Sequence, residues 1–193
     1  MEYVVFGLVI VIGLYFISIY NNLVKYKNQL DNTFSQIEVQ LKRRYDLIPN
    51  LIEVAKGYMK HEKETLEAVI AARNEAQSSL NGLNQLDTTS IENFNQAEQG
   101  LVSSLGKMSF VMEDYPDLKA NENMMQLHEE LSTTENRIAF SRQAFNDAVM
   151  VFNTYRQSFP QNMLASKFGF MHDAMNLEFE DSQEIKKAPK VSF

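Results

Sequence analysis

An uncharged apolar run opens the chain and constrains its fold more than any other feature. It extends from Tyr3 to Tyr20 and reads YVVFGLVIVIGLYFISIY. A bilayer core is about 30 Å thick and needs about 20 mostly apolar residues to cross it, a length that residues 21–24 complete. A cleaved signal peptide would carry Lys or Arg before the run and small residues after it, whereas only Met1 and Glu2 precede it here. The run predicts a single-pass membrane anchor over residues 1–24, and its span includes Tyr3, Phe6, Leu14 and Tyr20.

Basic residues flank this run on one side only. Lys25 and Lys27 follow it closely, the cluster Lys42-Arg43-Arg44 lies further along, and nothing basic precedes it. Basic residues beside a span stay on the cytoplasmic side. We therefore expect the N-terminus outside the cell and the rest of the chain in the cytoplasm.

Beyond the span the apolar residues recur with the spacing of amphipathic helices. The first helix is predicted from Leu23 to about Leu80, with Gly57 as a tolerated flaw that costs about 1 kcal/mol. Pro49 lacks an N–H and should disturb this helix, so we expect a kinked, continuous helix there, with a tight corner at residues 46–50 as the alternative. The apolar stripe consists of Phe34, Ile37, Leu41, Ile48, Ile52, Ala55, Met59, Leu66 and Val69.

The end of this helix and the start of the next carry cap signals. Asn81-Gly82 predicts a left-handed cap, and Asp87-Thr-Thr-Ser90 supplies N-cap candidates. A second helix is expected over about 91–113 and ends at residues 114–117, where Pro116 stops it. So short a connection predicts that the second and third helices are antiparallel neighbours.

A third long helix is predicted over about 118–159, and Pro160 closes it. Ile138 and Phe145 share its apolar face. A short fourth helix is expected around 163–168. The charged residues 176–193 predict a mobile tail.

Composition and motifs argue against several function classes. The net charge of −7 disfavours nucleic acid as a partner, because phosphate binding needs a basic face. No cysteine is present, so there is no disulfide framework and no thiolate nucleophile. His61, His128 and His172 have no metal-ligand spacing, and the segment 100–106 lacks the Lys-Ser/Thr ending of a phosphate loop. The sequence therefore predicts no catalytic residue, no cofactor and no metal.

Charged residues interrupt the apolar stripes. Arg44 lies between Leu41 and Ile48, and Glu135 and Arg142 interrupt the third helix. Because a lone buried charge is very costly, we expect Arg44 and Glu135 to meet inside the bundle and to share two parallel hydrogen bonds. A layer that fixes helix register is favoured, and a binding or catalytic site is the alternative. The predicted polar layer consists of Arg44, Asp46, Glu135 and Arg142.

Several blocks of the sequence resemble the LemA family of bacterial membrane proteins. They are Tyr20 to Val24, Gln40 to Leu51, Gly57-Tyr58, His61-Glu62, Thr134 to Asp147, Phe152-Asn153 through Phe159-Pro160, Ala165 to Phe170 and Pro189 to Phe193. The resemblance implies an all-α protein of the bacterial inner membrane, with an N-terminal transmembrane helix before an up-and-down antiparallel four-helix bundle. The bundle would occupy residues 25–175. The resemblance implies no particular reaction.

We expect a non-enzymatic, membrane-anchored scaffold, with the bilayer as one partner. Its bundle would bind itself, as a homo-oligomer, or another membrane-associated protein. A membrane-shaping coat protein is one alternative, and a small-molecule sensor or enzyme that uses the polar layer is another. A pocket on which Arg44, Asp46 and Glu135 converge would favour the sensor or enzyme.

Overall fold

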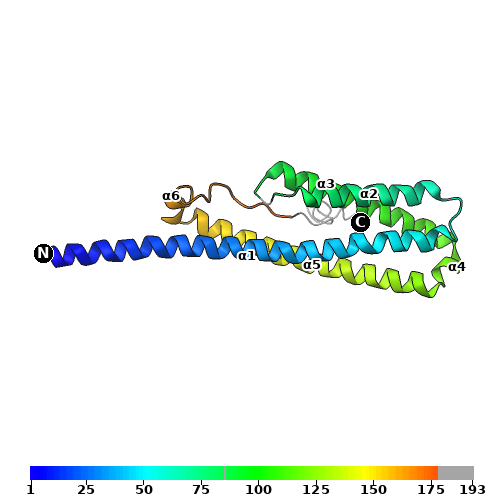
Figure 1. The fold of residues 1–193 in the computed structure, drawn as a ribbon, viewed down its shortest axis with the longest axis horizontal. Coiled ribbons are helices and arrows are strands. Elements are labelled where there is room, and N and C mark those ends of the chain that lie inside the picture. The colour runs from blue at the N-terminus through cyan, green and yellow to red at the C-terminus, as the bar shows by residue number, and fades with distance from the viewer. Residues whose placement is uncertain (85, 178–193) are drawn as a thin grey trace, which may run out of the picture.

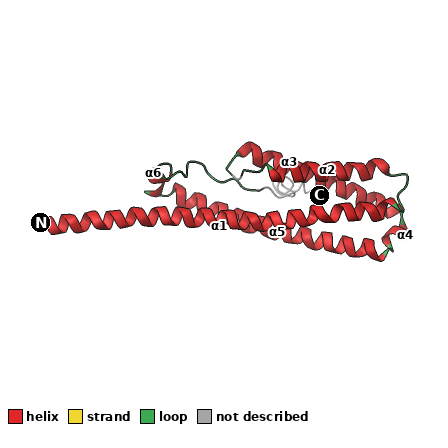
Figure 2. Cartoon of the chain, viewed as in Figure 1, coloured by secondary structure: helices red, strands yellow, loops and turns green. Residues whose placement is uncertain are grey.

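The computed structural model describes residues 1–84 and 86–177, and over these residues the chain forms helices and no strand (Figures 1 and 2). In chain order the elements are α1 (Glu2–Lys56), α2 (Lys63–Asn81), α3 (Thr88–Val111), the 3-10 turn η1 (Met112–Asp114), α4 (Pro116–Lys119), α5 (Glu122–Gln157) and α6 (Gln161–Ala165).

Four of these helices form an up-and-down antiparallel bundle, as the resemblance implied. The later part of α1 runs toward one end of the molecule, α2 returns, α3 reverses again, and α5 returns alongside α1 (Figure 1). The closest pairs are α1 with α5 and α2 with α3, while α2 also contacts α1.

The predicted helix from Leu23 to Leu80 was wrong, because the chain reverses between Lys56 and Lys63. Gly57 ends α1, and Met59 is buried in the turn. The apolar stripe keeps its phase across the turn, so periodicity does not reveal it. The reversal returns Leu66 and Val69 to the same core as Ile52, whereas a straight helix would leave that half of the stripe without a partner.

At Pro49 the helix continues, and the alternative corner at residues 46–50 was wrong. A proline leaves the carbonyl four residues earlier without its helical donor, and here that carbonyl belongs to Tyr45. Arg73 on α2 donates its Nε to the Tyr45 carbonyl oxygen at 3.0 Å. A second helix thus replaces the hydrogen bond that the proline removes.

Several helix ends differ from the sequence-based expectation. Gly82 has a φ of −96°, so the predicted left-handed cap was wrong. Asp87 caps α3 by accepting from the Ser90 backbone N–H at 3.2 Å. The third long helix starts at Glu122 and not at 118, because the single turn α4 intervenes and Asn121 caps α5. The short fourth helix is α6, which begins at Gln161 and ends at Ala165.

One core runs through the bundle. Phe145 is fully buried, and its ring lies 5.7 Å from that of Phe34 across the α1–α5 contact. Ile138 is buried on the same face of α5, which confirms the predicted helical phase.

The segment after α6 returns along α5, and two asparagine side chains hold its backbone. Asn153 donates to the Ala174 carbonyl at 2.8 Å and accepts from the Ala174 N–H at 2.9 Å. Asn146 makes the same pair of bonds with Leu177, each at 2.9 Å. Ala174 and Leu177 are buried in the main core. The bundle therefore includes Leu177, past the expected boundary at residue 175, and the rest of the predicted tail lies outside the described residues.

The N-terminal part of α1 extends beyond the bundle on its own (Figure 1). Its side chains, among them Tyr3, Phe6 and Leu14, are exposed. This is the one described helix long and apolar enough to cross a membrane. Because α1 has no break, the apolar segment and the bundle share a single helix axis.

Candidate functional site

A buried layer of charged side chains crosses the middle of the bundle. Arg44 on α1 is completely buried, and its Nη1 donates to both carboxylate oxygens of Glu135 on α5, at 2.9 and 3.1 Å. Its Nη2 donates to Glu98 on α3. Arg44 and Glu135 therefore meet as predicted, although one nitrogen and not two parallel donors makes the contact.

Glu98 is the centre of this layer. Besides Arg44, its Oε2 accepts from Nη2 of Arg142 on α5 at 3.1 Å, and its Oε1 accepts from the Tyr45 hydroxyl at 2.5 Å. Two arginines and two glutamates thus balance in charge, and they connect α1, α3 and α5. The Nε atoms of the two arginines have no hydrogen-bond partner among the described residues.

The buried charges perturb one another's protonation. Burial alone would lower the pKa of Arg44, but the carboxylates of Glu98 and Glu135 outweigh it and raise that pKa. Burial, followed by the negative charge of Glu98, raises the pKa of the Tyr45 phenol. The layer therefore holds a charged arginine beside a protonated tyrosine.

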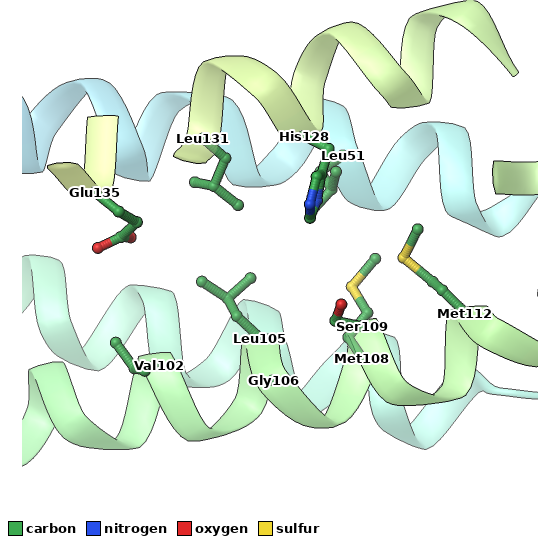
Figure 3. Close-up of a pocket in the computed structure, with 10 residues that line it drawn as sticks. All are labelled: Leu51, Val102, Leu105, Gly106, Met108, Ser109, Met112, His128, Leu131 and Glu135. Atoms are coloured by element: carbon green, nitrogen blue, oxygen red, sulfur yellow. The ribbon is translucent and has the colours of Figure 1, made fainter. Parts of the chain in front are cut away.

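A groove opens beside this layer, where α3 and α5 face each other without pairing along their lengths. It encloses about 320 Å³. Figure 3 shows Leu105 on α3 and Leu131 on α5 pointing toward each other across it, with Glu135 at one end. The lining residues are Leu51, Val102, Leu105, Gly106, Met108, Ser109, Met112, His128, Leu131 and Glu135.

A second cavity of about 250 Å³ adjoins the first. The two share Ser109, Met112 and His128, so they form one continuous groove. The second cavity is also lined by Met124 and Met125. The groove is therefore mostly apolar and rich in methionine, and its ionisable lining residues are Glu113, Lys119, His128 and Glu135.

The groove and the layer meet at Glu135. Its side chain is 37% exposed, and the pairing with Arg44 balances its charge. In the described part of the chain, no three His, Asp or Glu side chains come together in a way that could hold a metal ion. The arrangement suits the burial of apolar surface better than it suits the binding of a charged cofactor.

The sequence model of the LemA family matches residues 33–193, which is most of the chain. The chain belongs to the LemA family. The match starts within α1, beyond the apolar segment, and includes the rest of α1 and all of α2 to α6.

Named relatives agree with this membership. Protein LemA of Metamycoplasma hominis is 28% identical over 167 residues, which are 86% of this chain and 71% of that protein. Magnetosome protein MamQ of Magnetospirillum gryphiswaldense is 25% identical over 168 residues, which are 78% of this chain and 62% of that protein. The same figures hold for Magnetosome protein MamQ 1 of Paramagnetospirillum magneticum.

In this LemA-family chain, three of the four predicted layer residues come together: Arg44, Glu135 and Arg142. The prediction that Asp46 belongs to the layer was wrong, because its side chain is exposed on α1. Two residues of helix turn a side chain about 200° away from Arg44. The convergence of Arg44, Asp46 and Glu135 on one pocket is therefore absent.

Sequence reasoning missed Glu98 and Tyr45, although the spacing of each was a usable signal. Glu98 stands four residues after Phe94 and three before Leu101, which places it on the apolar face of α3. Tyr45 stands four residues after Leu41 and three before Ile48, which places it on the buried stripe of α1. A buried hydroxyl and a buried carboxylate both need hydrogen-bond partners, and here they supply one another.

Proposed function

We propose that this LemA-family protein is a membrane-anchored, non-enzymatic adaptor whose α3–α5 groove binds an amphipathic helix of a protein partner. The observation that carries the proposal is the open apolar groove itself, next to a charge layer that is already paired internally. Arg44 has no exposed surface and its charge is neutralised, which supports a register-fixing role for the layer.

The dimensions of the groove fit a helix. On α5 the lining extends from Met124 to Glu135, which is roughly 16 Å, or three turns, of helix. A partner helix with apolar residues at positions i, i+4, i+7 and i+11 would present them along that length. Methionine side chains adapt their shape to different apolar surfaces, and four of them line the two cavities.

The position of the groove fits an adaptor. From Tyr20 to Leu51, α1 is one uninterrupted helix that extends roughly 46 Å. The anchor would therefore hold the groove at a set distance from the bilayer, on the cytoplasmic side if the orientation follows Lys25 and Lys27.

Two glycines on α3 provide a matched test. Gly106 lines the groove and Gly100 does not, and a Cβ added at either position meets no atom within 4 Å. A photo-reactive amino acid at Ser109 in intact membranes should crosslink to one protein. Gly106→Phe, which fills the groove, should abolish that crosslink, and Gly100→Phe should preserve it.

Mass spectrometry of the crosslinked product identifies the occupant. A second protein supports the adaptor, and a second copy of this chain shows self-association through the groove. A crosslink that survives Gly106→Phe, or capture of lipid alone, would overturn the proposal.

A further inference from the structure

The end of the bundle nearest the apolar segment has its own small core. Ile19 and Leu23 on α1 are buried against Ala165 of α6, with Leu164 and Phe168 packed beside them. The ring of Tyr20 lies edge-on to that of Phe168 at 5.3 Å. The α5–α6 corner is thereby attached to a single turn of α1.

That turn lies where the span must leave the bilayer. About 20 residues of helix cross a hydrocarbon core of about 30 Å, so a span that starts at Tyr3 ends near residue 22. Because α1 is uninterrupted, this depth falls between Ile19 and Leu23. The element packed on those residues therefore lies at the membrane interface.

Two large apolar side chains on the outer side of this corner have no cover among the described residues. Phe159 is 78% exposed and Met163 is 62% exposed. Residues 19–31 and 154–177 carry four Lys or Arg and two Asp, whereas the whole chain has a net charge of −7. Lys27 pairs with Asp31 and Arg156 with Asp173, so Lys25 and Lys167 supply the net positive charge near the corner. Apolar side chains beside basic ones are typical of elements that lie in a headgroup region.

We propose that the α5–α6 corner, residues 159–168, is a second membrane-binding element, which inserts Phe159 and Met163 into the leaflet from which α1 emerges. The inference rests on the membrane anchoring in the proposed function. One helix would leave the bundle free to rotate about its axis. A second attachment at the same depth fixes that rotation, and with it the direction in which the distal groove faces.

The chain contains no tryptophan, so a single introduced tryptophan reports its own surroundings. Three full-length variants are compared in vesicles of phosphatidylcholine and phosphatidylglycerol with brominated acyl chains, which quench tryptophan by contact. Phe159→Trp tests the corner, and Leu14→Trp tests the span. Phe110→Trp is the matched control, because Phe110 is 75% exposed and lies on the distal part of α3.

We expect bromolipid quenching and blue-shifted emission for Phe159→Trp and Leu14→Trp, whereas Phe110→Trp stays unquenched and is accessible to iodide in the water. If Leu14→Trp is quenched while Phe159→Trp behaves like Phe110→Trp, the corner does not enter the membrane and the anchor still stands. If neither variant is quenched, the apolar segment does not insert into the bilayer, and the proposed function of a membrane-anchored adaptor fails as well.

Discussion

Glu98 joins three helices through one carboxylate. Arg44 from α1 and Arg142 from α5 both donate to it, and it is only 3% exposed. Glu135 also pairs with Arg44, but its side chain is 37% exposed. Solvent weakens ion pairs, so the two carboxylates should contribute unequally to stability although both contact the same arginine.

Double-mutant cycles test this inequality. Arg44→Met should lower the free energy of unfolding by about 3–5 kcal/mol, because it removes one member of a buried charge network. The coupling energy of Arg44→Met with Glu98→Leu should exceed that with Glu135→Leu. Both are measured by denaturant unfolding of the full chain in detergent, followed by circular dichroism. Additive effects in both cycles would show that Arg44 is not energetically coupled to either carboxylate.

Tyr45 should make the folding stability of this layer depend on pH. Its pKa is raised in the folded chain, first by burial and then by Glu98, whereas an unfolded tyrosine has a pKa of about 10. The folded state therefore retains the phenolic proton above that pH. The contribution of the Tyr45 phenol to folding stability is complete below about pH 10 and declines as the pH rises further.

We expect the melting temperature of the wild type to fall more steeply above about pH 10 than that of Tyr45→Phe, which has no phenol at this position to titrate. Thermal melts at a series of pH values measure this. Parallel curves for the two proteins would show that Tyr45 does not couple folding to pH.

Among the elements, α1 depends on α2 for its continuity. Pro49 deprives the Tyr45 carbonyl of a donor, and Arg73 supplies another from the facing helix at 3.0 Å. An unpaired carbonyl in this partly buried position is unfavourable by about 1–3 kcal/mol. The kink-prone residue is thus tolerated because of a tertiary contact.

Arg73→Met should therefore lower the free energy of unfolding by about 1–3 kcal/mol in the wild type. In a Pro49→Ala background, Arg73→Met should lower the free energy of unfolding by less, because alanine at position 49 restores a helical N–H donor to the Tyr45 carbonyl. Chemical unfolding of the four proteins in the cycle measures the difference. An equal loss in both backgrounds would mean that Arg73 acts through another contact.

On the scale of the whole molecule, α1 contains both the apolar N-terminal segment and one helix of the bundle. With the anchoring proposed above, the continuous helix α1 would hold the groove at a fixed distance from the bilayer, on whichever side the bundle lies. Only the basic residues after the span bear on the choice of side.

We predict that the N-terminus lies outside and the bundle inside, since Lys25 and Lys27 follow the span and no basic residue precedes it. A reporter that is active only in the cytoplasm, fused after Phe193, should be active in cells. A matched fusion to a reporter that works only after export should be silent, and the reverse pair of results would invert the topology.

The sequence alone determined the features that depend on residue type and spacing. An apolar run long enough to span a bilayer, helices with buried stripes, the burial of Ile138 and Phe145 and the family all followed from local pattern. The contact between Arg44 and Glu135 followed as well, because a charge on a buried helix face is very unfavourable unless an opposite charge pairs with it.

Only the tertiary structure decided which faces oppose one another. Periodicity states that a face is buried but not against which helix, so it missed the turn after Gly57, where the stripe continues in phase. The predicted layer included Asp46, which lies about 200° around the helix from Arg44, and it lacked Glu98, whose contact with Arg44 depends on where α3 sits. The open α3–α5 groove and the α6 contact with Ile19 and Leu23 likewise arise from unequal helix pairing, which is a balance of packing across the whole chain and leaves no mark in a local pattern.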